Sequence, residues 1–186
     1  MERLERLERL ELLERLELLE QLERSRNANV SKKTDPPISP VMRELSAYIG
    51  AALRKPLPPA VVEKTKHHIL DTIAAMISGS RLLPGRKAIG YVKTLGGVKE
   101  ATVIGSRIVT SAVNAALANG MLAHADETDD SHAPSLTHPG CGIVPAALAM
   151  AERARRSGTA LLRAVTLGYD VGCRLAQSLL AYHFRQ

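Results

Sequence analysis

The sequence predicts a mainly α-helical domain with at most one short β-hairpin, preceded by a low-complexity helical leader. Hydrophobic residues make up 45% of the 186 residues but aromatic residues only 3%, and the apolar content is mostly Ala, Leu, Val and Ile, which suits packed helices better than a β-sandwich. Apolar residues also recur at helical spacing beyond residue 40. Prolines and glycines separate these stretches and mark where helices begin and end.

The leader, residues 1–26, repeats Leu at every third position from Leu4 to Leu22. A three-residue step drifts about 60° around an α-helix, so these leucines form neither a single stripe nor a heptad seam. Glu–Arg pairs four residues apart, such as Glu20 and Arg24, favour helix formation. The leader is either an oligomerisation arm or a segment without a packing partner, and its period favours the second interpretation.

Residues 27–39 are polar and contain prolines, which predicts a linker, and residues 40–186 form the partial helical domain. Its first helix is expected at 41–53 and its second from Pro58–Pro59 to Gly79. The apolar residues expected on one face of the second helix are Val62, Ile69, Leu70, Ile73, Met76 and Ile77.

Further along, the pattern predicts a helix at 85–95, a hairpin at 101–109 and a helix at 143–156. Between the last two, a helix capped by Thr110 or Ser111 is expected to end at His124. The last helix begins near Thr159, and its small residues Gly168, Gly172 and Ala176 predict the close approach of a neighbouring helix.

Cysteine usage and the lack of targeting segments exclude several classes of function. Two cysteines without a CxxC motif fit a reducing compartment and argue against a disulfide scaffold or a thiolate zinc site. No apolar run reaches the roughly 18–20 residues of a membrane span, no secretory signal is recognisable, and the acidic leader does not resemble a mitochondrial transit peptide. We therefore expect a cytoplasmic protein that does not bind a membrane.

The net charge of +6 is unevenly distributed, because eight Glu and six Arg give the leader −2 and leave +8 for the remaining residues. The basic residues are scattered and no aromatic residues lie between them for base stacking. This favours attraction of small anionic substrates over nucleic-acid binding.

The stretch HADETDDSHAPSLTHPG, residues 124–140, gathers four carboxylates and three imidazoles between two apolar stretches. It could be a metal site, an acid–base site or a solvated loop that only caps its neighbours. The metal interpretation lacks an HExxH motif, and the pair Asp129–Asp130 matches the aspartate-rich magnesium motif of isoprenoid synthases only weakly. We expect no metal.

Acid–base chemistry has more support, since carboxylates beside imidazoles move the pKa values of such a group apart. His138 precedes Pro139, and Gly140-Cys141-Gly142 lead into a helix whose open N–H groups could hold a substrate carboxylate. Spacing alone leaves the solvated-loop alternative open.

Other candidate residues have less support. A helix start could activate Cys141 as a nucleophile, although a small buried thiol is favoured. His67 and His68 are expected at the surface, and neither a GxSxG elbow nor a nucleotide-binding glycine motif occurs.

The segment AALANGMLAHADETDDSHAPSLTHPGCGIVPAALAMAE, with ATVIGS before it and GYDVGCRLAQSL after it, resembles the MmgE/PrpD family. That family includes 2-methylcitrate dehydratase, cis-aconitate decarboxylase and iminodisuccinate epimerase. The resemblance covers about residues 40–186 and rests on NG-x-x-AHA, E-x-DDS-H and THPG in this order.

The resemblance implies a largely helical domain that full-length members combine with a smaller α/β lid, in a homodimer, without metal or organic cofactor. It implies that Glu127 and His138 are the catalytic acid–base pair and that Ser131 binds substrate. Asp129, Asp130 and Gly140 complete the expected substrate-binding set. Thr128 stands where the family has an aromatic residue.

Family members are more than twice this length and have further active-site residues downstream, so we expect an N-terminal fragment. The leading hypothesis is the N-terminal part of a lyase acting on small di- or tricarboxylates such as 2-methylcitrate. The alternative is a non-catalytic helical fragment with at most a role in subunit association. The residues that would separate dehydration from decarboxylation or epimerisation are not in this sequence.

Overall fold

The computed structural model describes residues 20–22, 24–25, 38–52 and 54–183. The chain divides into two compact units, residues 1–46 and 47–186. In the first unit, residues 20–22 and 24–25 are helical, and Arg24 Nη2 lies 3.5 Å from Glu20 Oε2, as the predicted pairing requires. The remainder of the leader and most of the expected linker lie outside the described residues.

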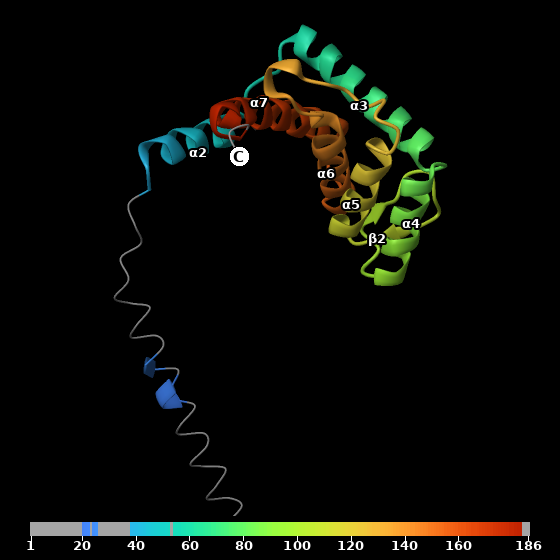
Figure 1. The fold of residues 1–186 in the computed structure, drawn as a ribbon. Helices are drawn as coiled ribbons and strands as arrows, with labels where there is room; N and C mark the ends of the chain where they lie inside the picture. The colour runs from blue at the N-terminus through green and yellow to red at the C-terminus, as the bar shows by residue number, and fades with distance from the viewer. Residues whose placement is uncertain (1–19, 23, 26–37, 53, 184–186) are drawn as a thin grey trace, which may run out of the picture. The chain divides into compact units, whose positions relative to one another are not determined.

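The described elements confirm a mainly α-helical fold with one short hairpin (Figure 1). In chain order they are α2 (Pro40–Ala52), α3 (Pro59–Gly79), α4 (Leu83–Leu95), β1 (Ala101–Thr102), β2 (Val109–Thr110), α5 (Ala112–Ala123), the 3₁₀ helix η1 (Ala133–Ser135), α6 (Pro139–Arg153) and α7 (Gly158–His183). None of the helices in the described part of the chain combines the length and the hydrophobicity needed to cross a bilayer.

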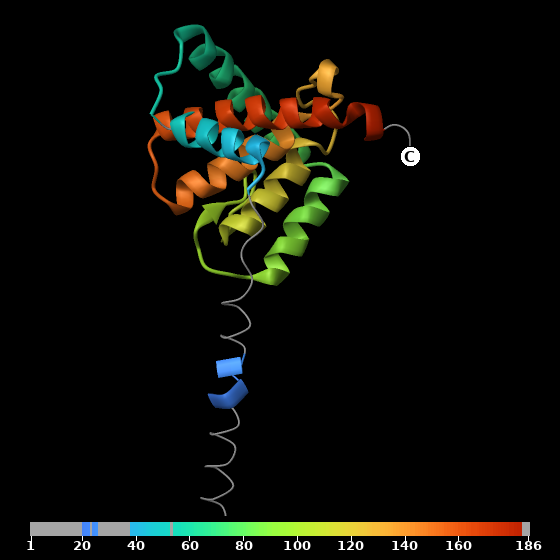
Figure 2. The ribbon, with the colours of Figure 1, turned by 90° about the vertical axis from the view of Figure 1, so that its left-hand side faces the viewer.

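Helix α5 lies at the centre of the second unit, where it packs against α3, α4 and α6, and α7 packs across α6 and α3 (Figure 2). The core is rich in alanine and valine, and small side chains let the helix axes approach closely. Its buried members are Met76, Val92, Ala101, Val103, Ala112, Ala115, Ala118, Leu122, Ala123, Val144, Ala149 and Val165. This packing is the one that the low aromatic content predicts.

The predicted close approach along α7 is confirmed at Gly168. A Cβ atom on this glycine would lie 2.6 Å from Cγ2 of Ile143 on α6, well inside van der Waals contact. The α6–α7 packing therefore requires a glycine here.

The predicted apolar face of α3 is too wide, and two residues at its edge are exposed. Met76 is completely buried, but Leu70 and Ile77 are 68% and 48% exposed. Each follows an inward-facing position by one residue, which places it about 100° further around the helix. Thr65 and Thr72 occupy the buried face in their place.

Two helices begin earlier than predicted. Helix α4 starts at Leu83 instead of residue 85, and α6 starts at Pro139 instead of residue 143 and ends at Arg153. Both have a proline in the first turn, where the missing N–H group costs nothing because no helical acceptor exists there. The capping prediction for α5 is confirmed, because the Ser111 side chain accepts a hydrogen bond from Asn114 N.

The predicted hairpin is confirmed, with Ala101 paired to Thr110 and Thr102 to Val109, and side chains from the helices fix it. Asn119 of α5 is buried, accepts a hydrogen bond from Ile104 N at 2.8 Å and donates one to Thr102 O at 3.0 Å. Glu152 of α6 accepts bonds from the backbone N and the hydroxyl of Thr102, both at 2.9 Å.

Replacing Asn119 with alanine should lower the free energy of unfolding by about 2–4 kcal/mol, because it leaves a backbone donor and a backbone acceptor unsatisfied. Urea unfolding followed by circular dichroism measures this loss. The control is Asn114→Ala, which removes only longer bonds of 3.3 and 3.4 Å to Gly96 O and Thr110 Oγ1. Equal losses in the two variants would contradict the anchoring role of Asn119.

Candidate active site

The acidic loop connects α5 to α6 and is folded on itself. His132 pairs with Thr137 in an antiparallel bridge, and the Ser135 hydroxyl lies 2.6 Å from His132 Nδ1 and 2.7 Å from Thr137 Oγ1. Asp126 accepts bonds from the hydroxyls of Thr128 (2.7 Å) and Ser78 (2.8 Å), which lower its pKa. These contacts give the loop a defined internal structure, and they leave open whether it only caps its neighbours.

Asp129 is the buried centre of this loop. Its side chain is 0% exposed, while those of His124 and His138 are 48% and 39% exposed. Nδ1 of His124 lies 3.1 and 3.2 Å from the two carboxylate oxygens, and Nδ1 of His138 lies 3.6 Å from Oδ1. The two imidazole centroids are 5.1 Å apart. One buried carboxylate thus faces two partly exposed imidazoles.

Cys141, in the first turn of α6, donates a hydrogen bond to His138 O at 3.1 Å. Burial, a hydrogen bond to Asp129 and the negative charges of Asp129 and Asp130 raise the pKa of this thiol to about 11. One potential metal ligand atom from each of His124, Asp129 and Cys141 lies within 4.8 Å of the others. In this structure the three residues are linked by hydrogen bonds, and a metal would have to displace the thiol proton to bind here, so the absence of a metal stays a prediction.

Cys141 should therefore react slowly with iodoacetamide at pH 8, and its rate should keep rising with pH until it levels off near about 11. The measurement is alkylation followed by mass spectrometry in a Cys173→Ser background, since Cys173 is the second free thiol. Unfolded protein is the control and should react with an ordinary cysteine profile. A folded chain that reacts as fast as the unfolded one at pH 8 would support the nucleophile interpretation instead.

Asp130 connects the end of the loop to three helices. Oδ1 accepts a hydrogen bond from Gly140 N of α6 at 2.8 Å, and Oδ2 accepts one from the Tyr169 hydroxyl of α7 at 2.6 Å. His68 Nδ1 of α3 lies 3.3 Å from Oδ2, and its ring contacts that of Tyr169 at a centroid distance of 4.7 Å. Burial and the bond to Asp130 raise the pKa of Tyr169 far above its usual value. The surface prediction holds for His67 but is wrong for His68, which is half-buried against the site.

Gly140 leaves no space for a side chain. A Cβ atom there would lie 2.5 Å from Asp130 Oδ1, 2.8 Å from Thr72 Oγ1 and 2.9 Å from the Tyr169 hydroxyl. Its N–H group, predicted to bind a substrate carboxylate, is bonded to Asp130 in this structure. The carboxylate at the start of α6 is therefore one that the protein supplies itself.

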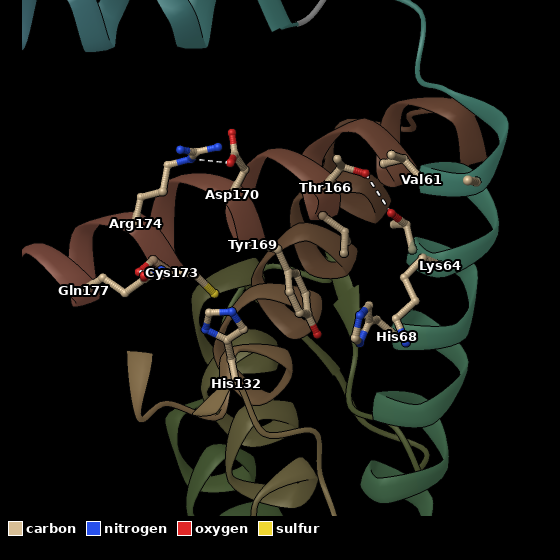
Figure 3. A pocket seen from close by; sticks show the side chains of 13 residues that line it. Val61, Lys64, His68, His132, Thr166, Tyr169, Asp170, Cys173, Arg174 and Gln177 are labelled. Atoms are coloured by element: carbon tan, nitrogen blue, oxygen red, sulfur yellow. Dashed lines mark hydrogen bonds and ion pairs between the residues drawn. The ribbon is translucent and has the colours of Figure 1, made fainter. Parts of the chain in front are cut away.

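Two hollows adjoin this network. One, of about 740 Å³, lies along α3 and α7; Tyr169 points into it between His68 and His132 (Figure 3). The other, of about 600 Å³, is lined by Lys64, His67, His68, Leu70, Asp71, Ala74, Asp130 and Ser131. The second hollow brings two predicted substrate-binding residues, Asp130 and Ser131, beside three basic side chains of α3.

The predicted pair Glu127 and His138 is not joined by a direct contact. Glu127 is exposed, adopts a left-handed backbone conformation with φ of 57°, and makes no hydrogen bond or ion pair with any described residue. Sequence reasoning also gave no role to His68 and Tyr169. Only the crossing of α3 and α7 brings them to Asp130, so no local sequence signal identifies them.

Comparison with known proteins places the sequence in a family. The family model of the MmgE/PrpD N-terminal domain matches residues 43–185. The cis-aconitate decarboxylase-like protein oryM of Aspergillus oryzae is 27% identical over 146 residues, which are 75% of this chain and 30% of that protein. Cis-aconitate decarboxylase of Aspergillus terreus is also 27% identical over 146 residues, covering 76% of this chain and 30% of the enzyme.

The chain thus spans about 30% of the length of these curated relatives. No solved structure matches it significantly. The matched region contains all of the acidic loop and each helix that contributes a side chain to its network. This chain belongs to the MmgE/PrpD family, of which it carries the N-terminal domain.

Proposed function

We propose that this chain is the site-bearing N-terminal domain of a lyase that acts on small di- or tricarboxylates. The observation that carries the proposal is the half-exposed imidazole of His138 above the fully buried carboxylate of Asp129. A carboxylate that binds one nitrogen of an imidazole makes the other nitrogen a stronger proton acceptor, and it stabilises the imidazolium that forms.

In the proposed reaction His138 removes a proton from the carbon next to a substrate carboxylate. The electron pair of the broken C–H bond forms a C=C bond as the neighbouring C–O bond breaks. Glu127 supplies the proton with which the hydroxyl leaves as water. The exposure of Glu127 suits a group that meets the substrate and not the protein. A decarboxylation, as the names of the relatives specify, would use the same proton-transfer groups.

The hollow beside Ser131 is the proposed place for the substrate carboxylates. Lys64, His67 and His68 give it basic groups on the α3 side, and Ser131 offers a hydroxyl on the loop side. Lys64 is exposed and, among the described residues, takes part in no ion pair, so its charge is available to a ligand. Asp71 and Asp130 line the same hollow, so an anion would be held there by direct contacts with Lys64 and Ser131 and not by a net positive charge of the hollow.

The test is titration of the 186-residue chain with cis-aconitate and with citrate, observed by NMR of the histidine rings. We expect saturable shifts of the His138 and His68 signals, weaker shifts with acetate, and none with the uncharged trimethyl citrate. Lys64→Gln should weaken binding of the tricarboxylates. Lys66→Gln, the matched control on the same helix, should not, because Lys66 pairs with Glu63 at 2.6 Å outside the hollow. Identical affinity in both variants would reject the proposed site.

A second candidate function is association with another copy of the chain, favoured by one face of α5. Val113, Leu117 and Met121 follow each other at four-residue spacing and are 75%, 47% and 45% exposed. An uninterrupted apolar stripe of this kind can pack against its own copy across a two-fold axis. Sedimentation analysis should then show a dimer that Leu117→Glu dissociates, while a monomeric wild type would exclude this function.

A further inference from the structure

Two imidazoles and a thiol surround the single carboxylate of Asp129, and His124 makes the shortest contact. His124 Nδ1 lies within hydrogen-bond distance of both oxygens, His138 Nδ1 faces Oδ1, and the Cys141 thiol completes the surroundings. The side chain is completely shielded from solvent. A buried carboxylate cannot exchange these partners for water, so its negative charge depends on them.

Both rings present the same nitrogen to this carboxylate. An ionised carboxylate only accepts hydrogen bonds, so a neutral imidazole that binds it must carry its proton on Nδ1. Nε2 is then the unprotonated nitrogen, with a lone pair ready to take a proton. Among the described residues, Nε2 of neither His124 nor His138 takes part in a hydrogen bond or an ion pair.

We propose that Asp129 is a positioning residue that holds His124 and His138 in the Nδ1–H form, and that His124 is a second acid–base group of this site. The acid–base role of the two rings toward a substrate rests on the proposed function. The orientation itself is a property of the free protein. It replaces the predicted substrate-binding role of Asp129, because a side chain that is 0% exposed has no surface to offer a ligand.

Two imidazoles on one carboxylate extend the chemistry of the site. Their centroids are 5.1 Å apart and their planes are inclined by 57°, so two imidazoles with unprotonated Nε2 atoms lie close together. One ring can take a proton from carbon while the other, once protonated, returns a proton to a different atom.

The experiment is ¹⁵N NMR of the histidine rings in the 186-residue chain without substrate, because ring nitrogen shifts distinguish the two neutral tautomers. Spectra are recorded at a pH where the ring shifts themselves report neutral imidazoles; there we expect the Nδ1–H form for His124 and His138 in the wild type, whereas a free imidazole prefers Nε2–H. In Asp129→Asn the amide oxygen accepts from one ring and the amide NH₂ group donates to the other. One histidine should keep the Nδ1–H form, and the other should change to the Nε2–H form.

Asp126→Asn is the matched control, since it removes a carboxylate of the same loop that bonds Ser78 and Thr128 but no imidazole. It should leave both tautomers unchanged. Circular dichroism establishes that each variant is folded. Nε2–H tautomers in the wild type, or unchanged tautomers in folded Asp129→Asn, would overturn the proposal. Either result is independent of whether carboxylates bind at the hollow beside Ser131, so the two proposals can fail separately.

Discussion

Replacing Asp130 with alanine should lower the free energy of unfolding by about 3–5 kcal/mol, the largest stability effect that we expect from one side chain in this domain. Asp130 is 12% exposed and accepts hydrogen bonds from Gly140 N and the Tyr169 hydroxyl. Its loss leaves both donors inside the protein without their acceptor and removes the carboxylate that lies 3.3 Å from His68 Nδ1. Chemical unfolding followed by circular dichroism measures the difference.

The matched control is Asp126→Ala. Asp126 belongs to the same loop and also accepts two hydroxyl hydrogen bonds, but these lie at the surface, where such bonds contribute about 1 kcal/mol or less. The loss of unfolding free energy in Asp130→Asn should lie between those of Asp130→Ala and Asp126→Ala, because an amide oxygen can still accept the hydrogen bond from Gly140 N. An Asp130→Ala variant as stable as the control would show that the loop, and not this carboxylate, joins the three helices.

Most of the helices of this fold could be predicted because their signals are local. Apolar residues at helical spacing locate α3, α5 and α7, and Ser111 marks the start of α5. The starts of α4 and α6 were missed because their first turns contain proline and glycine, which also mark loops. The exposed edge of α3 was missed because periodicity identifies an apolar face but not how much of it a neighbour covers.

The candidate site could be predicted only where it is continuous in sequence. The acidic loop is evident from its composition, and the resemblance to the family gave residues such as Glu127 and His138 their expected roles. The adjacent carboxylates Asp129 and Asp130 have different partners in the folded protein. Asp129 faces two imidazoles, whereas Asp130 accepts hydrogen bonds from α6 and α7. Neighbours in a sequence point to different sides of a backbone turn, and spacing does not indicate which partner each will find.

Exchanging His138 for alanine should lower kcat by about 10²–10⁴-fold in an enzyme that carries this domain, the range that a positioned general base contributes. A suitable enzyme places residues 43–185 in the matching segment of the Aspergillus terreus cis-aconitate decarboxylase, with product formation measured by NMR. The active form of the chimera is compared with its own variants, so the ratio reports the loss of one imidazole. Ser131→Ala should mainly raise KM, since a substrate-binding hydroxyl acts before the proton moves.

His132→Ala is the control for His138→Ala. Its imidazole belongs to the same loop, but Nδ1 lies 2.6 Å from the Ser135 hydroxyl and not beside a buried carboxylate. Because no carboxylate of the described residues contacts this ring, its removal should change kcat only slightly. Solvent deuterium incorporation next to the substrate carboxylate separates the steps, and His138→Ala should abolish it together with turnover. A chimera that keeps its rate and its deuterium exchange without His138 would move the base to another residue, and His124 would then be the next to replace.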